Sequence, residues 1–374
     1  MNQQPERFLS LDVFRGMTLC FMIIVNSPGR GAIPFDMLEH APWHGFTPTD
    51  LVFPSFLFAV GNAMSFSMKK FSTMENSQVL WKIFKRTFLI FIIGYLLYWF
   101  PFFRYNEQGQ LFFSPIEHTR VMGVLQRIAL CFGIASLMIH YLSTKTVIWI
   151  SALFLIGYWI ILMVFGDSGA ELTIAGNAGN YLDKYLLGDS HLYHGEGIPF
   201  DPEGILSTLP SIVNVIIGYY AGKFIQEKGK GYESIAKLFF AGSLLVLIAL
   251  CWDIVFPVNK KIWTSSFVLI TCGIDLMVIG ALLYIIEVRQ SVKWTRFFVV
   301  FGKNPLFIYI VASLLMEIID MLFPQLHFSK WINLSFFQVI APGPLGSLLF
   351  AIGYMLVCWL VGYILDKRKI YIRV

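Results

Sequence analysis

The chain has 374 residues, of which 57% are hydrophobic, 17% aromatic and only 14% charged. A soluble domain carries about 25% charged residues, so this composition excludes a soluble globular protein. The apolar stretches are too continuous for the alternating strands of a β-barrel. In a membrane protein, a net charge of +5 reflects loop orientation rather than nucleic-acid binding. We therefore predict an all-α, polytopic membrane protein.

About ten apolar segments are long enough to span the bilayer as helices, since about 20 residues cross its ~30 Å hydrocarbon core. The predicted spans are 11–27, 50–68, 83–101, 121–142, 147–165, 204–224, 235–256, 263–287, 297–319 and 345–365. The first is expected to be a retained span and not a signal peptide, because Asp12 and Arg15 interrupt it and no small-residue cleavage site follows. The whole chain, 1–374, is predicted to form one transmembrane domain.

The charges of the connecting segments predict the orientation. Most of the 28 lysines and arginines, including Lys70 and Arg86, fall on the same side as both termini, which places the termini in the cytoplasm. The external side has longer connections at 28–49, 166–203 and 320–344. Connections of such length are usually functional, so we expect the chemistry on the external face.

The first external segment gathers polar side chains against the membrane. Asn26 ends the first span, His40 and His44 follow, and Asp50 stands at the mouth of the second span. Imidazole titrates near neutral pH, so either histidine could act as a general base, and spacing alone does not choose between them. The alternative is an interfacial cap in which Trp43 anchors the segment and Asp50 caps a helix.

The last part of the long external segment offers side chains for a polar acceptor. These are His191, Tyr193, Asp201 and Glu203. The carboxylates would accept hydrogens from hydroxyl or ammonium groups, while Tyr193 and Trp43 would offer aromatic faces. Alternatively, Asp201 caps a helix that begins at Pro202.

No metal site is expected from the sequence. His191 and His194 have the spacing HxxH, but they lie on a loop without a fixed helical face, and HExxH is absent. The five cysteines all lie in apolar stretches with no CxxC pattern. They are predicted to be buried apolar residues rather than ligands or disulfide partners.

Polar side chains at the depth of predicted spans need an explanation, because a charge there costs at least ~2.5 kcal/mol. The conspicuous ones are Gln126, Arg127, Lys303 and Asn304. Arg127 could pair with Asp12 or another acid, and Lys303 with its neighbour could satisfy the carbonyl that Pro305 frees. Arg15 could pair with Asp12, three residues away. Otherwise such residues mark a substrate path, as in a secondary transporter.

Five motifs follow one another along the chain. They are SLDVFRG at 10–16, HAPWHGFTPTDLVFPSFLF at 40–58, GVLQRIAL at 123–130, DPEGILSTLPSI at 201–212 and FGKNPLFIY at 301–309. In order and membrane setting they resemble the heparan-alpha-glucosaminide N-acetyltransferase family, over nearly the whole chain. The resemblance implies transfer of an acetyl group from cytoplasmic acetyl-CoA, across the bilayer, to an amino sugar on the far side.

The resemblance also implies roles for individual residues. The family's active histidine falls on His40 and not on His44, and its asparagine falls on Asn26. His40 would act as a general base or as a nucleophile that briefly holds the acetyl group, and Asn26 would donate to the developing oxyanion. Acetyl-CoA would need polar and cationic partners. The candidates are Arg127, Gln126, Lys303, Asn304, Arg86, Lys70 and Arg15.

The family suggests a homodimer, and the first span begins within about a dozen residues, without the luminal extension of the lysosomal enzyme. We therefore expect a multi-pass enzyme of the bacterial plasma (inner) membrane, with an acceptor other than heparan sulfate. Two alternatives stay open: O-acylation of external glycans, and a secondary transporter of a small polar or anionic solute.

Overall fold

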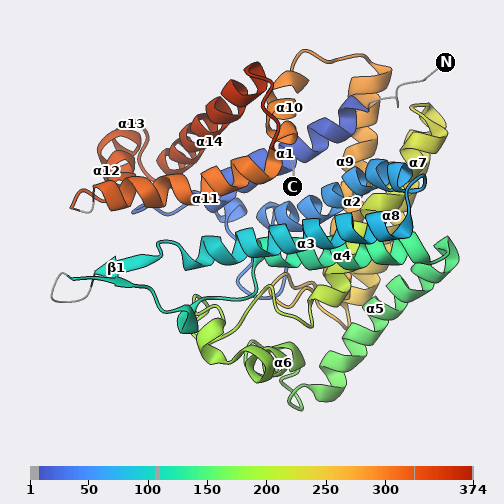
Figure 1. Cartoon of the computed structure of the whole chain (residues 1–374), viewed down its shortest axis with the longest axis horizontal. Coiled ribbons are helices and arrows are strands. Elements are labelled where there is room, and N and C mark those ends of the chain that lie inside the picture. Colours follow the sequence, from blue (N-terminus) through green and yellow to red (C-terminus); the bar gives the residue numbers. More distant parts are fainter. Residues whose placement is uncertain (1–7, 106–109, 324, 373–374) are drawn as a thin grey trace.

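The computed structural model describes residues 8–105, 110–323 and 325–372 (Figure 1). This part of the chain is mostly α-helical and contains a short antiparallel hairpin, β1 (Phe103–Tyr105) with β2 (Leu111–Phe113). The long helices are α1 (Leu9–Asn26), α2 (Val52–Phe71), α3 (Asn76–Trp99), α4 (Val124–Tyr141), α5 (Thr144–Phe165), α7 (Thr208–Lys228), α8 (Tyr232–Asp253), α9 (Ser265–Leu282), α11 (Pro305–Leu322) and α14 (Pro344–Lys367). The all-α prediction is confirmed.

Shorter helices connect or extend the long ones. The α-helical ones are α6 (Ala178–Leu187), α10 (Thr295–Lys303), α12 (Phe328–Ile332) and α13 (Gln338–Ile340). Single turns of 3₁₀-helix are η1 (Asp36–Leu38), η2 (Pro48–Leu51), η3 (Ile116–His118) and η4 (Asp189–His191), and π-helical turns are η5 (Leu283–Val288) and η6 (Asn333–Phe337).

Eight helices of the described residues are long and apolar enough to cross a membrane: α1, α2, α4, α5, α8, α9, α11 and α14. Two further predicted spans correspond to α3 and α7. Helix α3 carries Lys82, Lys85 and Arg86 within its length, and α7 includes polar residues such as Asn214 and packs against α2, α4, α5 and α9. A multi-pass membrane protein is therefore supported, while the count of ten spans and the side of the termini stay predictions.

One predicted span is interrupted. The segment 297–319 is not a continuous helix, because α10 ends at Lys303 and α11 begins at Pro305, with Asn304 in a non-helical conformation between them. Proline lacks a backbone N–H and disfavours the helical conformation of the residue before it. The chain therefore breaks at this point instead of leaving a free carbonyl inside one helix.

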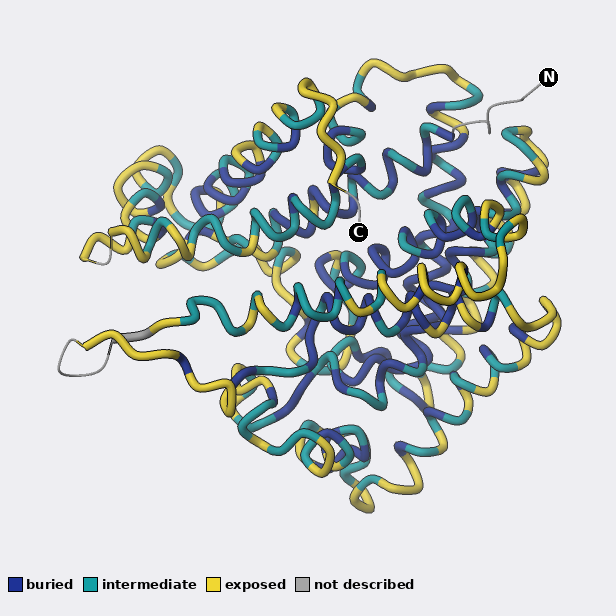
Figure 2. The backbone as a smooth tube through the Cα atoms, viewed as in Figure 1, coloured by how far each residue is buried: buried dark blue, intermediate teal, exposed yellow. Residues whose placement is uncertain are grey.

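The centre of the molecule is formed by closely packed helices. Figure 2 shows buried residues concentrated in the middle of the bundle, and α2 runs along α7 there. A Cβ atom added to Gly61 of α2 would lie 2.0 Å from the carbonyl oxygen of Val215, and one added to Gly218 of α7 would lie 2.2 Å from that of Phe58. The two backbones thus touch through glycines, as small residues allow in membrane helices.

The three long connections predicted to be external lie on one face. Arg30 Nη1 donates to Asp320 Oδ2 at 3.0 Å, which joins the first connection to the end of α11. Trp43 Nε1 donates to the carbonyl of Leu172 at 2.8 Å, which joins the same connection to the long one before α7. Together they cover the ends of the helices that frame the site.

Candidate active site

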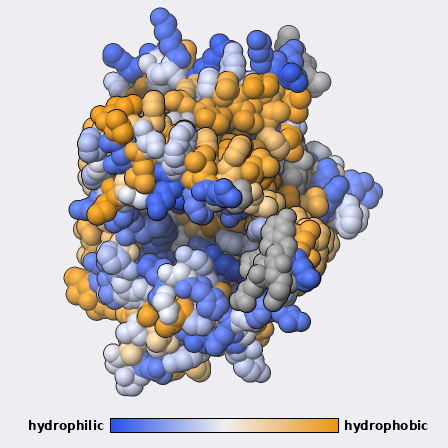
Figure 3. Space-filling view, turned by 90° about the vertical axis from the view of Figure 1, so that its left-hand side faces the viewer, coloured by the Kyte–Doolittle hydropathy of each residue, from blue (hydrophilic) through white to orange (hydrophobic). Residues whose placement is uncertain are grey.

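A cavity of about 260 Å³ lies where the end of α1, the start of α2, the segment before α7 and the loop between α8 and α9 meet. Its polar lining includes Asn26, His40, Asp50, Arg120, Glu203 and Lys260. The side of the molecule on the left in Figure 1 is hollowed near its middle, and hydrophilic residues surround the hollow (Figure 3). The structure therefore brings residues from distant parts of the sequence into one polar space.

His40 is oriented by Asp50, whose carboxylate is fully buried. Asp50 belongs to a capping box at the start of the second predicted span: its Oδ2 accepts the backbone N–H of Thr47 at 3.0 Å and that of Ala41 at 3.2 Å. The other oxygen, Oδ1, lies 2.8 Å from Nδ1 of His40. The expected capping role of Asp50 is confirmed, and the same side chain also positions the histidine.

Lys260 completes this group and was not predicted from the sequence. Its Nζ lies 2.8 Å from Nδ1 and 3.0 Å from Nε2 of His40, and 3.7 Å from Oδ1 of Asp50. Burial lowers the pKa of Lys260, although the carboxylates of Asp50 and Glu203 oppose this. Lys260 lies in the short loop between α8 and α9, 220 residues from His40, so only the tertiary packing reveals the contact.

The surroundings of His40 favour one neutral tautomer. The ionised carboxylate of Asp50 can only accept, so we assign the ring proton to Nδ1. In this tautomer the lone pair lies on Nε2, and Nζ of Lys260 lies 3.0 Å from Nε2 and 2.8 Å from Nδ1. A substrate amine that displaces Lys260 would find a proton acceptor already oriented.

Asn26 is the last residue of α1 and borders the same cavity. Its side chain makes no hydrogen bond to any residue that the structure describes. The chain leaves the helical conformation at Ser27, which puts Asn26 at the rim with its amide hydrogens available. That arrangement suits a donor to a developing oxyanion.

Arg120 holds the opposite wall together and was also not predicted. Its Nε and Nη2 bind the two oxygens of Asp201 at 2.9 and 2.6 Å, and Nη2 also donates to Glu203. The guanidinium lies over the rings of Tyr98 and Tyr193, 4.9 and 4.8 Å from their centroids. Burial alone would lower the pKa of Arg120, but the two carboxylates raise it.

The residues predicted to bind the acceptor are only partly assembled. Glu203 and Tyr193 line the cavity with His40, whereas Asp201 is buried behind them on Arg120. The alternative that Asp201 caps a helix starting at Pro202 is wrong, because α7 begins only at Thr208.

Two other predicted acceptor residues lie outside this cavity. Nδ1 of His191 is 2.8 Å from the carbonyl oxygen of Thr119, and Trp43 lines a neighbouring pocket. In the described residues, no group of three or more His, Cys, Asp or Glu side chains could hold a metal ion. All five cysteines are free, and four of them are buried, as predicted, while Cys251 is exposed on α8.

Arg127 is fully buried and reaches the segment just before α7. Its Nη2 donates to the carbonyl of Gly204 at 3.1 Å and to the hydroxyl of Ser207, and its guanidinium lies 4.9 Å from the ring centroid of Trp263. The Nε and Nη1 groups have no partner among the described residues. The suggested pairing with Asp12 is wrong, because Asp12 Oδ1 binds Arg15 Nη2 at 2.8 Å.

Gln126, next to Arg127, faces a second cavity. This space of about 180 Å³ lies between α3, α4 and α11, and it shares the side chain of Tyr309 with the His40 cavity. Gln126 is fully buried, and neither atom of its amide has a partner in the described part of the chain. A buried amide without partners is costly, so a ligand in this cavity would satisfy it.

The remaining candidates for acetyl-CoA differ in their surroundings. Arg15 Nε donates to the carbonyl of Gly302 at 2.9 Å and its Nη2 to Asp12 Oδ1 at 2.8 Å. The guanidinium of Arg86 on α3 lies 4.5 Å from the ring centroid of Phe132. Lys70 is exposed at the end of α2.

Lys303 and Asn304 are engaged with the C-terminal segment. Lys303 Nζ lies 2.6 Å from Asp366 Oδ1, and the Asn304 amide donates to the carbonyl of Ile370 and accepts from the backbone of Ile372. These contacts give the pair a structural role other than the expected one, because both side chains bind the C-terminal segment and not a carbonyl that Pro305 frees.

Asp183 of α6 supports the wall of the site and predicts a pH effect. Its Oδ1 accepts the N–H of Ile205 at 2.8 Å, and burial raises its pKa to about 7 from 3.8. Between these two pKa values the folded state holds a proton on Asp183 that the unfolded state has lost. This difference stabilises the folded state, and the stabilisation is lost as the pH rises through about 7. From pH 5 to 8 the loss should approach about 3 kcal/mol. Melting temperatures should fall over this range, and Asp183→Asn should flatten the profile; parallel profiles would contradict this role.

The fold and site are those of a multi-pass membrane protein with an oriented histidine in a polar cavity, and comparison with known proteins shows the family to which it belongs. Residues 7–250 match the family model described as heparan-alpha-glucosaminide N-acetyltransferase, catalytic. Since this is more than half of the chain, the protein belongs to the heparan-alpha-glucosaminide N-acetyltransferase family.

Two curated relatives carry the name heparan-alpha-glucosaminide N-acetyltransferase. The one from Homo sapiens is 28% identical over 364 residues, which cover 83% of this chain and 53% of the relative. The one from Mus musculus is 27% identical over 370 residues, which cover 83% and 55%. The chain thus spans about half the length of the curated relatives it matches.

Proposed function

We propose that this protein transfers an acetyl group from acetyl-CoA, supplied on the cytoplasmic side, to an amino sugar on the external side. The observation that carries the proposal is the buried Asp50 carboxylate, which orients His40 in a cavity that Asn26 also borders. Family membership supports the acetyl donor. An amino sugar is the acceptor in the name of the relatives. The panel of acceptors described below would determine which sugar this protein uses.

In the proposed reaction His40 takes the proton that the amine must lose before it can attack the thioester. Nε2 receives this proton, and Asp50 stabilises the imidazolium that results. As the C–N bond forms and the C–S bond of the thioester breaks, the imidazolium would return the proton to the sulfur, so that CoA leaves as the thiol. The ammonium of Lys260 must first give up its contact with Nε2. Because its charge opposes that of the imidazolium, it would also help to return the histidine to the neutral form.

Asn26 is proposed to stabilise the oxyanion. Asn26→Ala should lower kcat by about 10²–10³-fold, the usual cost of one oxyanion donor, with a smaller effect on the KM for either substrate. Asn26→Asp should be equally poor, because it keeps the shape and loses the N–H donors. Ser27→Ala, one residue further, serves as the control. A rise in KM with unchanged kcat would contradict the oxyanion role.

The residues between the site and the predicted cytoplasmic side fit acetyl-CoA. The amide of Gln126, which has no partner among the described residues, suits the amides of its long arm, whereas Arg127 lines neither the His40 cavity nor the Gln126 cavity. Arg86, whose Nε has no partner among the described residues, suits a phosphate, whereas Arg15 is already engaged with Asp12 and the carbonyl of Gly302. Acetyl-CoA would supply the activated acetyl group, and these residues would only bind and align it. Lys303 and Asn304 are less suited, since they are already engaged.

We propose that the protein lies in a bacterial plasma membrane with both termini in the cytoplasm. The basic connections on the side of the termini support this orientation. The test of function uses purified protein with radiolabelled acetyl-CoA and a panel of amino sugars and hydroxyl-bearing sugars. N-acetylated product above a no-protein blank supports the proposal. Product from hydroxyl acceptors alone would show O-acylation, and no product with any acceptor would overturn it.

A further inference from the structure

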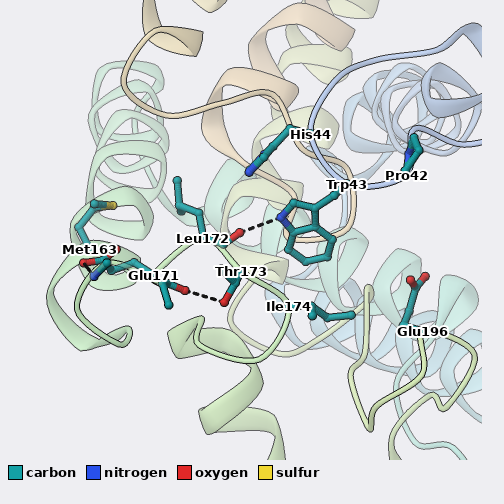
Figure 4. A pocket seen from close by; sticks show the side chains of 11 residues that line it. Pro42, Trp43, His44, Met163, Glu171, Leu172, Thr173, Ile174 and Glu196 are labelled. Carbon is teal, nitrogen blue, oxygen red and sulfur yellow. Dashed lines mark hydrogen bonds between the residues drawn. The ribbon is translucent and has the colours of Figure 1, made fainter.

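A second pocket adjoins the His40 cavity on the external face (Figure 4). Its volume is about 610 Å³, and residues from the first external connection and from the turn after α5 line it, among them Trp43, Glu171 and Leu172. Glu196 borders both cavities, and its Oε2 lies 2.5 Å from Nζ of Lys261, which lines the His40 cavity. The two spaces are therefore neighbours that share one wall.

Trp43 is held firmly in this pocket. In Figure 4 its indole stands beside Leu172, whose carbonyl oxygen accepts the N–H at 2.8 Å. The ring also packs against Phe200, with centroids 5.9 Å apart. The indole is only partly buried. A fixed, accessible aromatic ring beside polar groups is suited to the apolar face of a sugar ring.

The charges around the pocket select against anions. Glu171 and Glu196 line it, and within the described chain no lysine or arginine does. Burial lowers the pKa of His44, and a backbone N–H of Gly169 lowers that of Glu171, so at neutral pH the first is uncharged and the second ionised. A sulfate or carboxylate on a ligand would meet no cation in the lining, since Lys261 is paired with Glu196 in the shared wall, whereas hydroxyl and ammonium groups would find Glu171 as an acceptor.

We propose that this pocket binds the second sugar unit of the acceptor, and that this unit carries hydroxyl or ammonium groups but no sulfate or carboxylate. The inference rests on the proposed function, with the first unit placing its amine at His40. It defines the acceptor as a glycan of uncharged or cationic sugars, such as linked glucosamine units, rather than an acidic glycan.

The test compares kcat/KM for three acceptors: glucosamine, its β-1,4-linked dimer, and glucosamine linked to a uronic acid. The dimer should exceed the monomer by about tenfold, or about 1.4 kcal/mol, and the acidic disaccharide should show no such gain. Trp43→Ala should reduce the ratio of dimer to monomer to near one. Glu171→Lys should lower the dimer's kcat/KM severalfold at low salt and raise that of the acidic disaccharide.

Tyr185→Ala is the matched control, because this aromatic ring is 86% exposed on α6 and lines neither cavity. It should leave the ratio of dimer to monomer as in the wild type. If Trp43→Ala does not fold, the result for Glu171→Lys, a change at a half-buried residue, decides alone. An unchanged ratio in both variants, or a preference for the acidic disaccharide, would overturn the inference while His40-dependent acetylation of glucosamine persists. Absence of all acetylation would overturn the proposed function itself.

Discussion

Replacing His40 by alanine is expected to lower kcat for acetyl transfer by about 10²–10⁴-fold, the range for loss of a general base. The fold should survive, because the side chain is 41% exposed and leaves no buried cavity. Activity and melting temperature measured on the same preparation separate the two effects. The buried carboxylate of Asp50 keeps its backbone hydrogen bonds in the variant.

The matched control for this variant is His140→Ala. His140 is a histidine at the end of α4, where its Nε2 lies 3.0 Å from Asn76 Oδ1, away from the site. Its replacement should leave kcat near the wild-type value. If His40→Ala retained near wild-type kcat, His40 would be neither base nor nucleophile, and Lys260 would become the leading candidate for the base.

Replacing Arg120 by leucine should have the largest effect on stability. It would leave Asp201 and Glu203 buried without their cation, and removal of one partner of a buried ion pair costs about 3–5 kcal/mol. Arg120→Lys should recover part of this, since lysine keeps the charge but not the two-pronged contact with Asp201. Thermal unfolding followed by tryptophan fluorescence in detergent would measure both.

The control here is Arg30→Leu, which breaks the ion pair with Asp320. Arg30 is 60% exposed, so this pair should contribute less than about 1 kcal/mol. The melting temperature should therefore fall far more for Arg120→Leu than for Arg30→Leu. Equal losses would contradict the structural importance of the Arg120 network.

The long helices were predictable because unbroken apolar runs leave the backbone no other way to satisfy its hydrogen bonds in lipid. Local interruptions were less so. Pro305 indicates an irregular helix, but whether the helix breaks at Asn304 depends on the contacts around it. Asp366 binds Lys303 and the carbonyl of Ile370 binds Asn304, and both lie near the other end of the chain. The alternative for Arg127 failed for the same reason, since its partners lie near α7.

The candidate site was predictable where its residues are close in sequence. The motif from His40 to Asp50 holds both members of the central pair. Asp50 belongs to a capping box with Thr47, and it also accepts the N–H of Ala41, which folds the segment back onto its start. Lys260 and Arg120 carried no local signal. Each lies in a connection and acquires its role only when helices far apart in the sequence pack together.

The transmembrane direction of the reaction is tested most directly in sealed inside-out vesicles that enclose glucosamine and receive radiolabelled acetyl-CoA outside. In these vesicles the cytoplasmic face is outermost, so labelled N-acetylglucosamine should accumulate in the lumen of wild-type vesicles and not in His40→Ala vesicles. Product that forms only when acetyl-CoA and glucosamine are on the same side would contradict transfer across the bilayer.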